Sequence, residues 1–586
     1  MPQQAKNWKI YPPAPADFVA STPEHPLLLQ VLYNRGIRSA DEIKPFLTGS
    51  DAVRENPYKL RDMPQAVVRL VDAIKQKETI CVYGDFDADG VTATALLTTA
   101  LQSAGGRVGP YIPDRVDEGY GLNMEAMDRI AAKADLMVTV DCGIRSVAEV
   151  AHAKALGLDV IVTDHHSVGP DLPPALAVIN PRRKDCTSNF ERLAGVGVAF
   201  RLSQAVLRAV SQQKWSDLTP AQAGEIEESL LDYVAIGTVA DVMPLLGENR
   251  SLVQRGLAQL NSTERPGLQA LMAKSDTRQG SVDATAIAFR LAPRINAAGR
   301  LSQTTLAYRL LRTRDKSEAH KLSGQLESLN QQRRDITAAA QTEAEQLLLG
   351  PDGDETEAAR NLCFVSSPNF QSGIVGLVAG RLMDRYYRPA IVIERGDDES
   401  RGSARSIAEF DISSALDEVS GLLLRHGGHS RAAGFTVETK RLDEFHAALN
   451  TVAERELSKK ENLRPTLDVD AEVALNEINW ALQEQFARLE PTGQENPAPL
   501  LLCKNCRIRE IKKMSAGKHM RLTLDMAKGQ GSKNDQVVEA VAFNLGEWTK
   551  VLTEESLVDV VCQVEANEWQ GRRRLQLNVQ DLRLVE

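Results

Sequence analysis

The stretch VIVTDHH, residues 160–166, joins a short β-rich run to an aspartate and two adjacent histidines. Val160–Val162 are residue types typical of a buried strand, and Asp164, His165 and His166 follow at its end. A single buried histidine is more often structural than a metal ligand. Two adjacent histidines beside a carboxylate are an unusual way to build a core, whereas imidazole nitrogens and carboxylate oxygens are ligands of divalent metal ions. The stretch therefore predicts a metal site at a strand end.

Two more acidic clusters stand at the ends of predicted strands. The run TICVY (79–83) leads into DFDADG (85–90), and LMVTV (136–140) leads into Asp141. Between residues 60 and 180 predicted strands and helices alternate, which is typical of a parallel α/β sheet. Ligands bind outside the carboxyl ends of the strands in such sheets, so we expect the three clusters to share one rim.

Simpler structural roles compete with a metal site at each position. One aspartate of the 85–89 run could serve only as the N-cap of the following helix, and Asp141 could also be a cap. Asp241, which follows an apolar stretch, could be a carboxylate at a helix end or turn. Three aspartates between Gly84 and Gly90 would nevertheless repel one another unless a cation neutralised them.

Length and composition narrow the class of protein. With 586 residues the chain is too long for one core, and three or four domains are expected. No apolar run is long enough for a membrane span, and the N-terminus lacks the features of a secretory signal. Seven scattered cysteines indicate reduced thiols and a cytoplasmic protein. Cys503 and Cys506 are interpreted as strand residues, because a zinc site needs four ligands.

The acidic segments together match a known pattern. VYGDFDADGVTATALL, VTVDCGI, VIVTDHH and AIGTVADVMPL resemble, in order and spacing, the four motifs of the DHH phosphoesterase superfamily. HGGHSRAAGF (426–435) resembles the glycine-rich motif of the associated DHHA1 domain. Further stretches, among them LAGVGVAF (193–200), PRINAAGRL (293–301) and GSARS (402–406), extend the resemblance to the bacterial RecJ family of single-strand-specific 5′-to-3′ DNA exonucleases.

The resemblance implies an α/β fold: a parallel-sheet DHH domain and a smaller α/β DHHA1 domain are joined by a long helix and followed by an OB-like β-barrel. The sequence pattern agrees, because 315–348 is a long polar amphipathic stretch and the chain becomes strand-rich from about residue 463. The expected parts are an N-terminal helical segment (1–59), the DHH domain (60–314), the connecting helix (315–350), the DHHA1 domain (351–460) and an OB-like nucleic-acid-binding domain (461–586).

The resemblance also implies two divalent metal ions, Mn²⁺ or Mg²⁺, at the sheet rim. The implied metal ligands are Asp87, Asp89, Asp141, His165 and Asp241. Asp85 and His166 complete the implied catalytic set, the histidine as a ligand or an acid–base neighbour, and Asp164 would orient the histidines. Two such ions can activate a water molecule and stabilise the leaving oxygen of a phosphodiester. Mixed Asp and His ligation suits Mn²⁺ better than Mg²⁺, which favours an all-oxygen shell.

Substrate-binding roles follow from the same resemblance. The implied positions are Arg115, Asn296, Arg300, Ser403, Arg405 and the turn Gly427, Gly428, His429. Arginine side chains and exposed glycine amides are suited to phosphate. For each arginine taken alone, a surface ion pair is the alternative, and Tyr120 could stack on a base or pack in a core.

One position departs from the family pattern. Members commonly carry Trp-His at the start of the DHHA1 helix segment, where this chain has Phe370 and Gln371. The substrate contact of that histidine is therefore not expected here, although all the metal motifs are intact.

The last segment holds a local concentration of positive charge. Residues 504–521 contain seven lysines and arginines and one acidic residue, Glu510. Because the net charge of the chain is −10, a nucleic-acid partner would need such a local basic surface. On a barrel these residues could line a groove for a single strand, with Trp548 or Trp569 available for stacking. A solvated basic face is the alternative.

The sequence thus predicts a metal-dependent exonuclease that degrades single-stranded DNA from the 5′ end in repair and recombination. A cytoplasmic monomer is expected, without membrane association, with a single-strand-binding protein and a helicase as partners. Polarity, DNA preference, the role in repair and recombination and the partner proteins rest on the resemblance alone. A phosphodiesterase of short oligonucleotides or cyclic dinucleotides is the alternative enzyme, although such proteins generally lack the N-terminal helices and the barrel. A DNA-binding scaffold with a degenerate core would have lost Asp141, His165 or Asp241, and all three are present.

Overall fold

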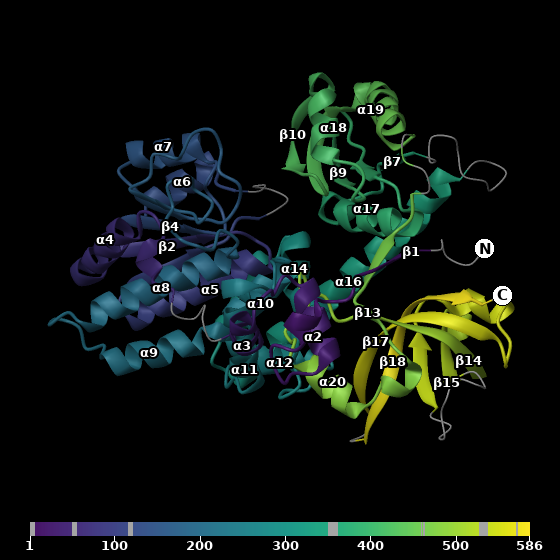
Figure 1. Ribbon diagram of the computed structural model, residues 1–586. Helices are drawn as coiled ribbons and strands as arrows, with labels where there is room; N and C mark the ends of the chain where they lie inside the picture. The colour runs from purple at the N-terminus through teal and green to yellow at the C-terminus, as the bar shows by residue number, and fades with distance from the viewer. Residues whose placement is uncertain are drawn as a thin grey trace. The chain divides into compact units, whose positions relative to one another are not determined.

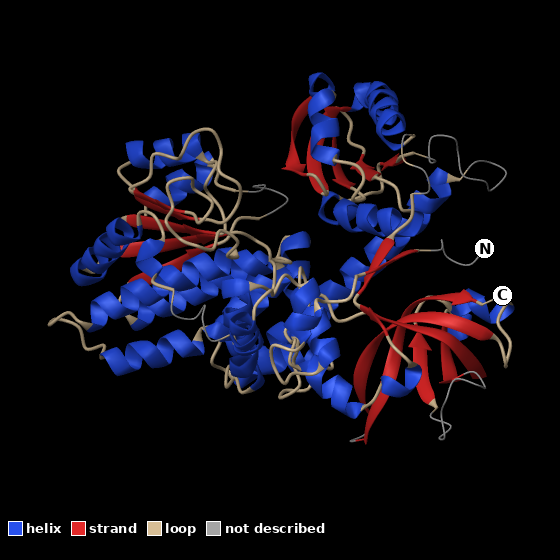
Figure 2. Cartoon of the chain, viewed as in Figure 1, coloured by secondary structure: helices blue, strands red, loops and turns tan. Residues whose placement is uncertain are grey.

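The structure is a computed structural model that describes residues 6–49, 55–114, 121–349, 361–458, 460, 463–526, 537–569 and 572–585. The chain forms two compact units, each assembled from segments far apart in the sequence (Figures 1 and 2). The first unit contains residues 1–53, 244–254 and 464–586, and the second contains 54–243 and 255–463. Within the described ranges, none of the helices combines the length and the apolar content that crossing a membrane requires.

The second unit begins with a five-stranded parallel sheet of order β3-β2-β4-β5-β6. Its strands are β2 (Thr79–Gly84), β3 (Arg107–Tyr111), β4 (Leu136–Val140), β5 (Asp159–Thr163) and β6 (Ala177–Ile179). β4 is buried along its whole length, and four of its five residues are apolar. Because the strands are parallel, their carboxyl ends share one rim, as the sequence predicted.

Helices cover both faces of this sheet (Figure 1). They are α6 (Met124–Ala131) and α7 (Val147–Ala155) on one face, and α4 (Met63–Gln76), α5 (Ala88–Ser103) and α8 (Gly195–Ser211) on the other. α4 buries Ala66, Leu70 and Ala73 at helical spacing. α5 is buried along most of its length, because it packs against the sheet, α8 and α10 (Leu231–Ala240). This enclosed helix starts at the functional rim.

Between α10 and Leu348 the second unit is helical. α12 (Pro266–Lys274), α14 (Ala292–Arg300) and α15 (Thr304–Arg312) pack against α16 (Lys316–Leu348). α16 has 33 residues and is therefore about 50 Å long. Asp315 caps it by accepting a hydrogen bond from the backbone N–H of Glu318 (2.7 Å). The long helix predicted at 315–348 is confirmed.

A mixed sheet of order β10-β11-β9-β8-β7 follows α16 in the second unit. Its strands are β7 (Cys363–Ser367), β8 (Ala390–Glu394), β9 (Glu399–Arg405), β10 (Leu423–His429) and β11 (Ala432–Glu438). β7 and β8 pair in parallel across α17 (Ser372–Tyr386), and the other pairs are antiparallel. α18 (Ile412–Glu418) and α19 (Leu442–Leu457) pack on this sheet.

The first unit is built on a closed five-stranded barrel. β14 (Leu501–Met514), β15 (His519–Met526), β16 (Val538–Ala542), β18 (Arg572–Leu584) and β17 (Leu557–Trp569) pair in that order, and β17 pairs back with β14. Cys503 and Cys506 are free, buried thiols on β14, as the sequence predicted. The predicted OB-like barrel is confirmed.

The N-terminal helices share the core of this barrel. α2 (Pro26–Asn34) and α3 (Ala40–Thr48) place Leu28 and Ile43 in the same apolar cluster as Leu522 and Val560 of the barrel strands. In addition, β1 (Asn7–Ile10) pairs in parallel with β12 (Thr466–Val469). The two ends of the chain, which the sequence pattern treats as separate segments, therefore complete one folded unit.

Candidate metal centre

Four segments bring acidic and histidine side chains to the rim of the parallel sheet. Asp85 follows β2, Asp141 follows β4, and Asp164 follows β5 directly. Asp87 is the N-cap of α5, since its Oδ1 accepts hydrogen bonds from the backbone N–H groups of Asp89 (2.9 Å) and Gly90 (3.0 Å). Asp241 stands at the C-terminal end of α10. The cap role considered for the first aspartate run thus belongs to Asp87.

His165 lies at the centre of this group. Its Nε2 is 3.0 Å from Asp141 Oδ1, 3.5 Å from Asp241 Oδ2 and 4.0 Å from Asp89 Oδ2. Potential ligand atoms within 4.8 Å of one another form three overlapping groups: Asp89, His165 and Asp241; Asp141, His165 and His166; and Asp85, Asp87 and Asp141. The structure thus brings together all seven residues predicted as catalytic, in a cluster large enough for more than one ion.

Two central atoms show that the cluster fits a metal ion. Asp141 Oδ1 and His165 Nε2 are buried and accept or donate no hydrogen bond within the described part of the chain, although they are only 3.0 Å apart. Neighbouring ligands of an ion with bond lengths near 2.1 Å stand about 3 Å apart. The pair therefore has the spacing of two ligands of one ion and lacks the alignment of a hydrogen bond.

The electrostatics of the cluster also favour a bound cation. Burial, and then repulsion from neighbouring aspartates, raises the pKa of Asp89, Asp141 and Asp241. Among the described residues, no lysine or arginine forms an ion pair with any of these three carboxylates. Because buried charges need compensation, a divalent ion is the natural source of the missing positive charge.

Asp164 holds the backbone of both histidines and the ring of His166. Its Oδ1 accepts hydrogen bonds from His166 Nδ1 (2.7 Å) and from the backbone N–H of His165 (2.7 Å) and His166 (3.0 Å), and its Oδ2 accepts one from Ile144 (2.9 Å). Such a second partner fixes which ring nitrogen is free for a ligand. Burial lowers the pKa of His165, which keeps its ring neutral and able to bind metal.

The backbone is strained at one candidate ligand and directly after another. Asp141 has φ of +61°, and Val242, directly after Asp241, has φ of +55°. Left-handed backbone is disfavoured for residues with a Cβ, especially a β-branched one, and it concentrates at functional sites. The fold holds these two turns in a disfavoured conformation where they aim carboxylates into the cluster.

Two glycines of neighbouring helices press against the carboxylates. A Cβ added at Gly195, the first residue of α8, would lie 2.5 Å from Asp141 Oδ1, and one at Gly237 of α10 would lie 2.7 Å from Asp89 Oδ1. The backbone N–H groups of Gly195 and Val196 also donate to Asp89 (2.7 and 2.9 Å). The sequence reasoning missed this role, since a glycine in LAGVGVAF carries no local sign of what it packs against.

The predicted substrate-binding residues of the first half differ in their surroundings. Arg115, like Tyr120, lies outside the described residues. Asn296 Oδ1 accepts a hydrogen bond from the backbone N–H of Ala88 (2.8 Å) and so supports the first turn of α5. Arg300 is half-buried and donates to the carbonyl oxygen of Gly373 (2.7 Å). Both described side chains thus have a structural contact beside the rim, and their substrate contacts remain predictions.

The glycine-rich motif forms a hairpin. Gly427, Gly428 and His429 were predicted as a turn, but they are the last residues of β10, and the turn is at 430–431. The prediction was wrong because glycine pairs are common in turns, whereas here Gly428 allows close strand packing: an added Cβ would lie 2.4 Å from the carbonyl oxygen of Ala432. On β9 of the same sheet, Arg405 donates to Ser403 Oγ (3.0 Å).

A cavity of about 470 Å³ joins this hairpin to the metal cluster. It is lined by residues of the DHH motif, by the segment after Asp141 and by the hairpin: Asp164, His166, Ser167, Gly143, Ile144, Arg145, Ser146, Gly427, Gly428 and His429 are among them. Arg145, which donates to the carbonyl oxygen of Ser167 (2.9 Å), was missed by the sequence reasoning. The sequence reasoning also missed Arg182. Burial and neighbouring aspartates raise the pKa of Asp241, and the positive charge of Arg182 partly offsets this rise. Both follow the rim strands, which is the signal that could have found them.

Family models agree with this architecture. Residues 79–238 match the DHH family, N-terminal domain; residues 360–455 match the DHHA1 domain; and residues 469–581 match the RecJ OB domain.

Relatives match along almost the whole chain. The single-stranded-DNA-specific exonuclease RecJ of Bacillus subtilis is 36% identical over 99% of this chain and 71% of its own length. The crystal structure of RecJ from Thermus thermophilus in complex with Mn²⁺ is 30% identical, covers 99% of this chain and 80% of that chain, and superposes with a TM-score of 0.81. The Mg²⁺ complex of the same organism's RecJ is 28% identical, covers 99% of this chain and 79% of that one, and has a TM-score of 0.76. The chain described here belongs to the RecJ family of DHH phosphoesterases.

Proposed function

We propose that this protein is a metal-dependent exonuclease that hydrolyses the phosphodiester bonds of single-stranded DNA from the 5′ end. The observation that carries the proposal is the buried cluster of Asp89, Asp141 and Asp241 around His165 Nε2, in which no described lysine or arginine forms an ion pair with a carboxylate. His166, beside this cluster, lines the 470 Å³ cavity, which is large enough for a terminal nucleotide.

The proposed ligand sets follow the overlapping groups of the cluster. Asp89, His165 and Asp241 would hold one ion, and Asp85, Asp87 and Asp141 the other, with Asp141 close to both sets. A pair of divalent ions, Mn²⁺ or Mg²⁺, would supply an activated water and stabilise the charge on the leaving oxygen. His166 lines the cavity and hydrogen-bonds Asp164 through its Nδ1; its imidazole would serve as an acid–base group at the scissile phosphate.

Residues that line the cavity, together with side chains of the second sheet, would bind the DNA backbone. Arg145 and the exposed Gly427–His429 edge line the same cavity as His166, and Ser403 and Arg405 lie on β9, in the same sheet as that edge. Guanidinium groups and free backbone N–H groups bind phosphate well. Gln371 is exposed at the N-cap of α17, so this chain would grip its substrate without the histidine that is common at that position.

Single strands labelled at either end test the reaction directly. With Mn²⁺ or Mg²⁺ we expect the 5′ label of a single strand to be released first as a mononucleotide, while a blunt duplex stays largely intact. EDTA should abolish release, because the carboxylate cluster then lacks its cations. Earlier release of the 3′ label would contradict the polarity. Faster hydrolysis of a dinucleotide than of a long single strand would favour the phosphodiesterase alternative.

The barrel would bind the strand through only part of its basic segment. Lys504, Arg507, Arg509 and Lys512 are in ion pairs with acidic residues, three of them with acids outside the segment. Lys513, Lys518 and Arg521 are exposed and make no ion pair within the described residues. Of the two tryptophans predicted to stack on bases, Trp548 packs against the barrel core, and the side chain of Trp569 lies outside the described residues. Phe543, by contrast, is 49% exposed. We infer that the three free cations and Phe543 contact DNA.

Replacing the three free cations by alanine should weaken single-strand binding and make it less sensitive to salt. Three lost phosphate contacts would lower the slope of log K against log salt by about 2. Fluorescence anisotropy with a labelled oligonucleotide at several salt concentrations measures both quantities. Lys504→Ala is the matched control, because its ammonium group already pairs with Glu472 (2.7 Å). An unchanged slope in the triple variant would refute the proposed surface.

We further infer that the protein works in the cytoplasm as a monomer, beside a helicase and a single-strand-binding protein. The support is chemical: an enzyme that acts on single strands depends on a reaction that unwinds duplex DNA. Sedimentation tests the oligomeric state. The dependence on an unwinding reaction is tested by incubating the protein with duplex DNA, which should be degraded only when an unwinding activity is added.

A further inference from the structure

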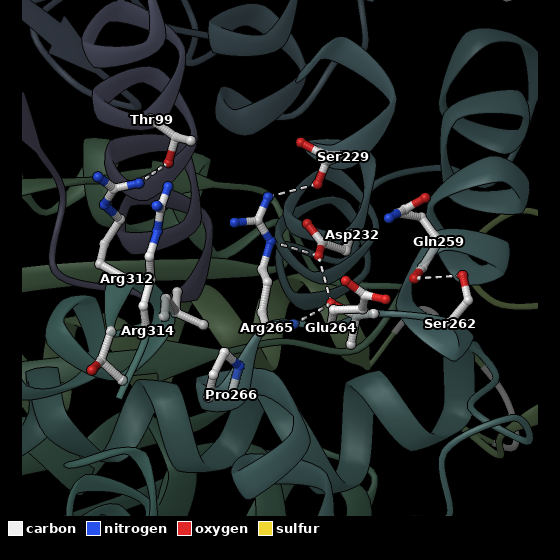
Figure 3. A pocket seen from close by; sticks show the side chains of 13 residues that line it. Thr99, Ser229, Asp232, Gln259, Ser262, Glu264, Arg265, Pro266, Arg312 and Arg314 are labelled. Carbon is white, nitrogen blue, oxygen red and sulfur yellow. Dashed lines mark hydrogen bonds and ion pairs between the residues drawn. The ribbon is translucent and has the colours of Figure 1, made fainter. Parts of the chain in front are cut away.

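The second unit contains a cavity of about 620 Å³ whose lining shares no residue with the metal cluster (Figure 3). α5 brings Thr99 to this cavity, and α10 brings Asp232. These residues stand ten positions after Asp89 and nine positions before Asp241, which corresponds to about 15 and 13 Å along the helices. Two helices that carry candidate metal ligands therefore also reach this cavity.

One lining arginine, Arg265, forms an ion pair with the lining carboxylate of Asp232. Arg265 Nε is 2.8 Å from Asp232 Oδ2, and Arg265 Nη2 donates to the carbonyl oxygen of Ser229 (2.7 Å). Asp232 is completely buried, so this pair belongs to the fold. The other lining carboxylate, Glu264, is exposed.

Two lining arginines have no carboxylate partner among the residues that the structure describes. Arg312 is held by neutral oxygens, since it donates to Thr99 Oγ1 and Gln102 Oε1. Arg314 is exposed and makes no hydrogen bond or ion pair to a described residue. Figure 3 shows both side chains on the Thr99 side of the cavity. Neighbouring guanidinium groups repel one another, so an anion between them would be strongly favoured.

We propose that this cavity is a second anion site that binds the phosphate group of a small nucleotide. Planar guanidinium groups match the oxygens of a phosphate in paired hydrogen bonds. The cavity volume of about 620 Å³ exceeds what a bare phosphate requires and lies in the range of small-molecule sites. Ser229 and Ser262 also line the cavity; each hydroxyl donates to a backbone carbonyl oxygen one turn earlier and can still accept a hydrogen bond from a sugar or base. An occupied site would touch both helices that position Asp89 and Asp241.

Calorimetric titration of the full chain in EDTA tests the site without relying on the nuclease reaction. The probes are deoxyadenosine 5′-monophosphate, inorganic phosphate and deoxyadenosine. We expect the monophosphate to bind and deoxyadenosine not to bind. The double variant Arg312→Ala/Arg314→Ala should bind the monophosphate at least tenfold more weakly, whereas Asp141→Asn should bind it like the wild type.

Matched variants separate loss of the site from loss of the fold. Arg309→Ala removes a neighbouring arginine of α15 that pairs with Glu318 (2.7 Å) and does not line the cavity, so affinity should be unchanged. Arg314→Ala alone removes no internal contact and should weaken binding while unfolding at the wild-type temperature. Equal affinity in the wild type and the double variant would overturn the proposal. Inorganic phosphate binding as tightly as the monophosphate would overturn the nucleotide as its ligand.

Discussion

Replacing Asp141 by asparagine will lower the rate of single-strand cleavage by about 10³-fold. The substitution keeps the side-chain volume and removes the carboxylate that lies closest to His165 Nε2 (3.0 Å). Metal ions contribute several kcal/mol of transition-state stabilisation, and each 1.4 kcal/mol corresponds to about a tenfold change in rate. Release of a 5′-labelled nucleotide under saturating Mn²⁺ measures the effect.

The same variant should remain folded and should still bind a single strand. Burial among like charges raises the pKa of Asp141, which means that its charged form costs stability in the metal-free protein. In EDTA the variant should therefore unfold at the same temperature as the wild type or higher, and Mn²⁺ should raise the unfolding temperature of the wild type more. Asp128→Asn, an exposed aspartate paired with His152, is the matched control. Undiminished cleavage in Asp141→Asn would remove the two-metal proposal.

Replacing Gly195 by alanine will lower cleavage by on the order of 10²-fold although it removes no ligand. The added Cβ would lie 2.5 Å from Asp141 Oδ1 and 2.6 Å from its Cγ, so either the carboxylate or the start of α8 must move. A displacement of about 1 Å in a catalytic group can reduce the rate by that factor. The expected signature is a lower kcat with little change in strand affinity, measured by steady-state cleavage and by anisotropy.

Gly197 provides the control for this substitution, because it lies on the same helix two residues later. The three atoms nearest to its added Cβ all belong to the side chain of Leu193, the first at 3.2 Å. Gly197→Ala should therefore keep nearly full activity. If Gly195→Ala and Gly197→Ala had equal activities, the close packing of α8 against Asp141 would have no role in positioning the carboxylate.

The sheet and its rim could be predicted because the residues that form each strand and those that end it stand next to each other in the sequence. VIVTDHH, TICVYGDFDADG and LMVTVDCGI each contain both a strand and the polar residues that end it. Parallel pairing then places all three ends together, whatever the details of packing. The start of α3 is equally local: Glu42, three residues after the N-cap Ser39, accepts a hydrogen bond from the backbone N–H of Ser39 (2.9 Å).

The sequence could not predict which basic side chains of 504–521 are paired with acidic residues, because most of the partners come from elsewhere in the chain. Arg507 and Arg509 both pair with Asp525 of β15, and Lys504 pairs with Glu472 of β13 (Ala471–Glu472). Within 504–521 only Glu510 is acidic, so the segment looks uniformly positive in the sequence. Strand pairing across the barrel neutralises part of this charge and leaves Lys513, Lys518 and Arg521 free.

By itself, the sequence determined which residues end each strand of the parallel sheet. It therefore also determined that aspartates and histidines meet at one rim. Only the tertiary structure decided what packs behind them. Gly195 and Gly237 press against Asp141 and Asp89, and the two ends of the chain complete one barrel core. The physical reason is that periodicity and turn chemistry act over a few residues, whereas close packing and charge compensation depend on neighbours that only the folded chain brings together.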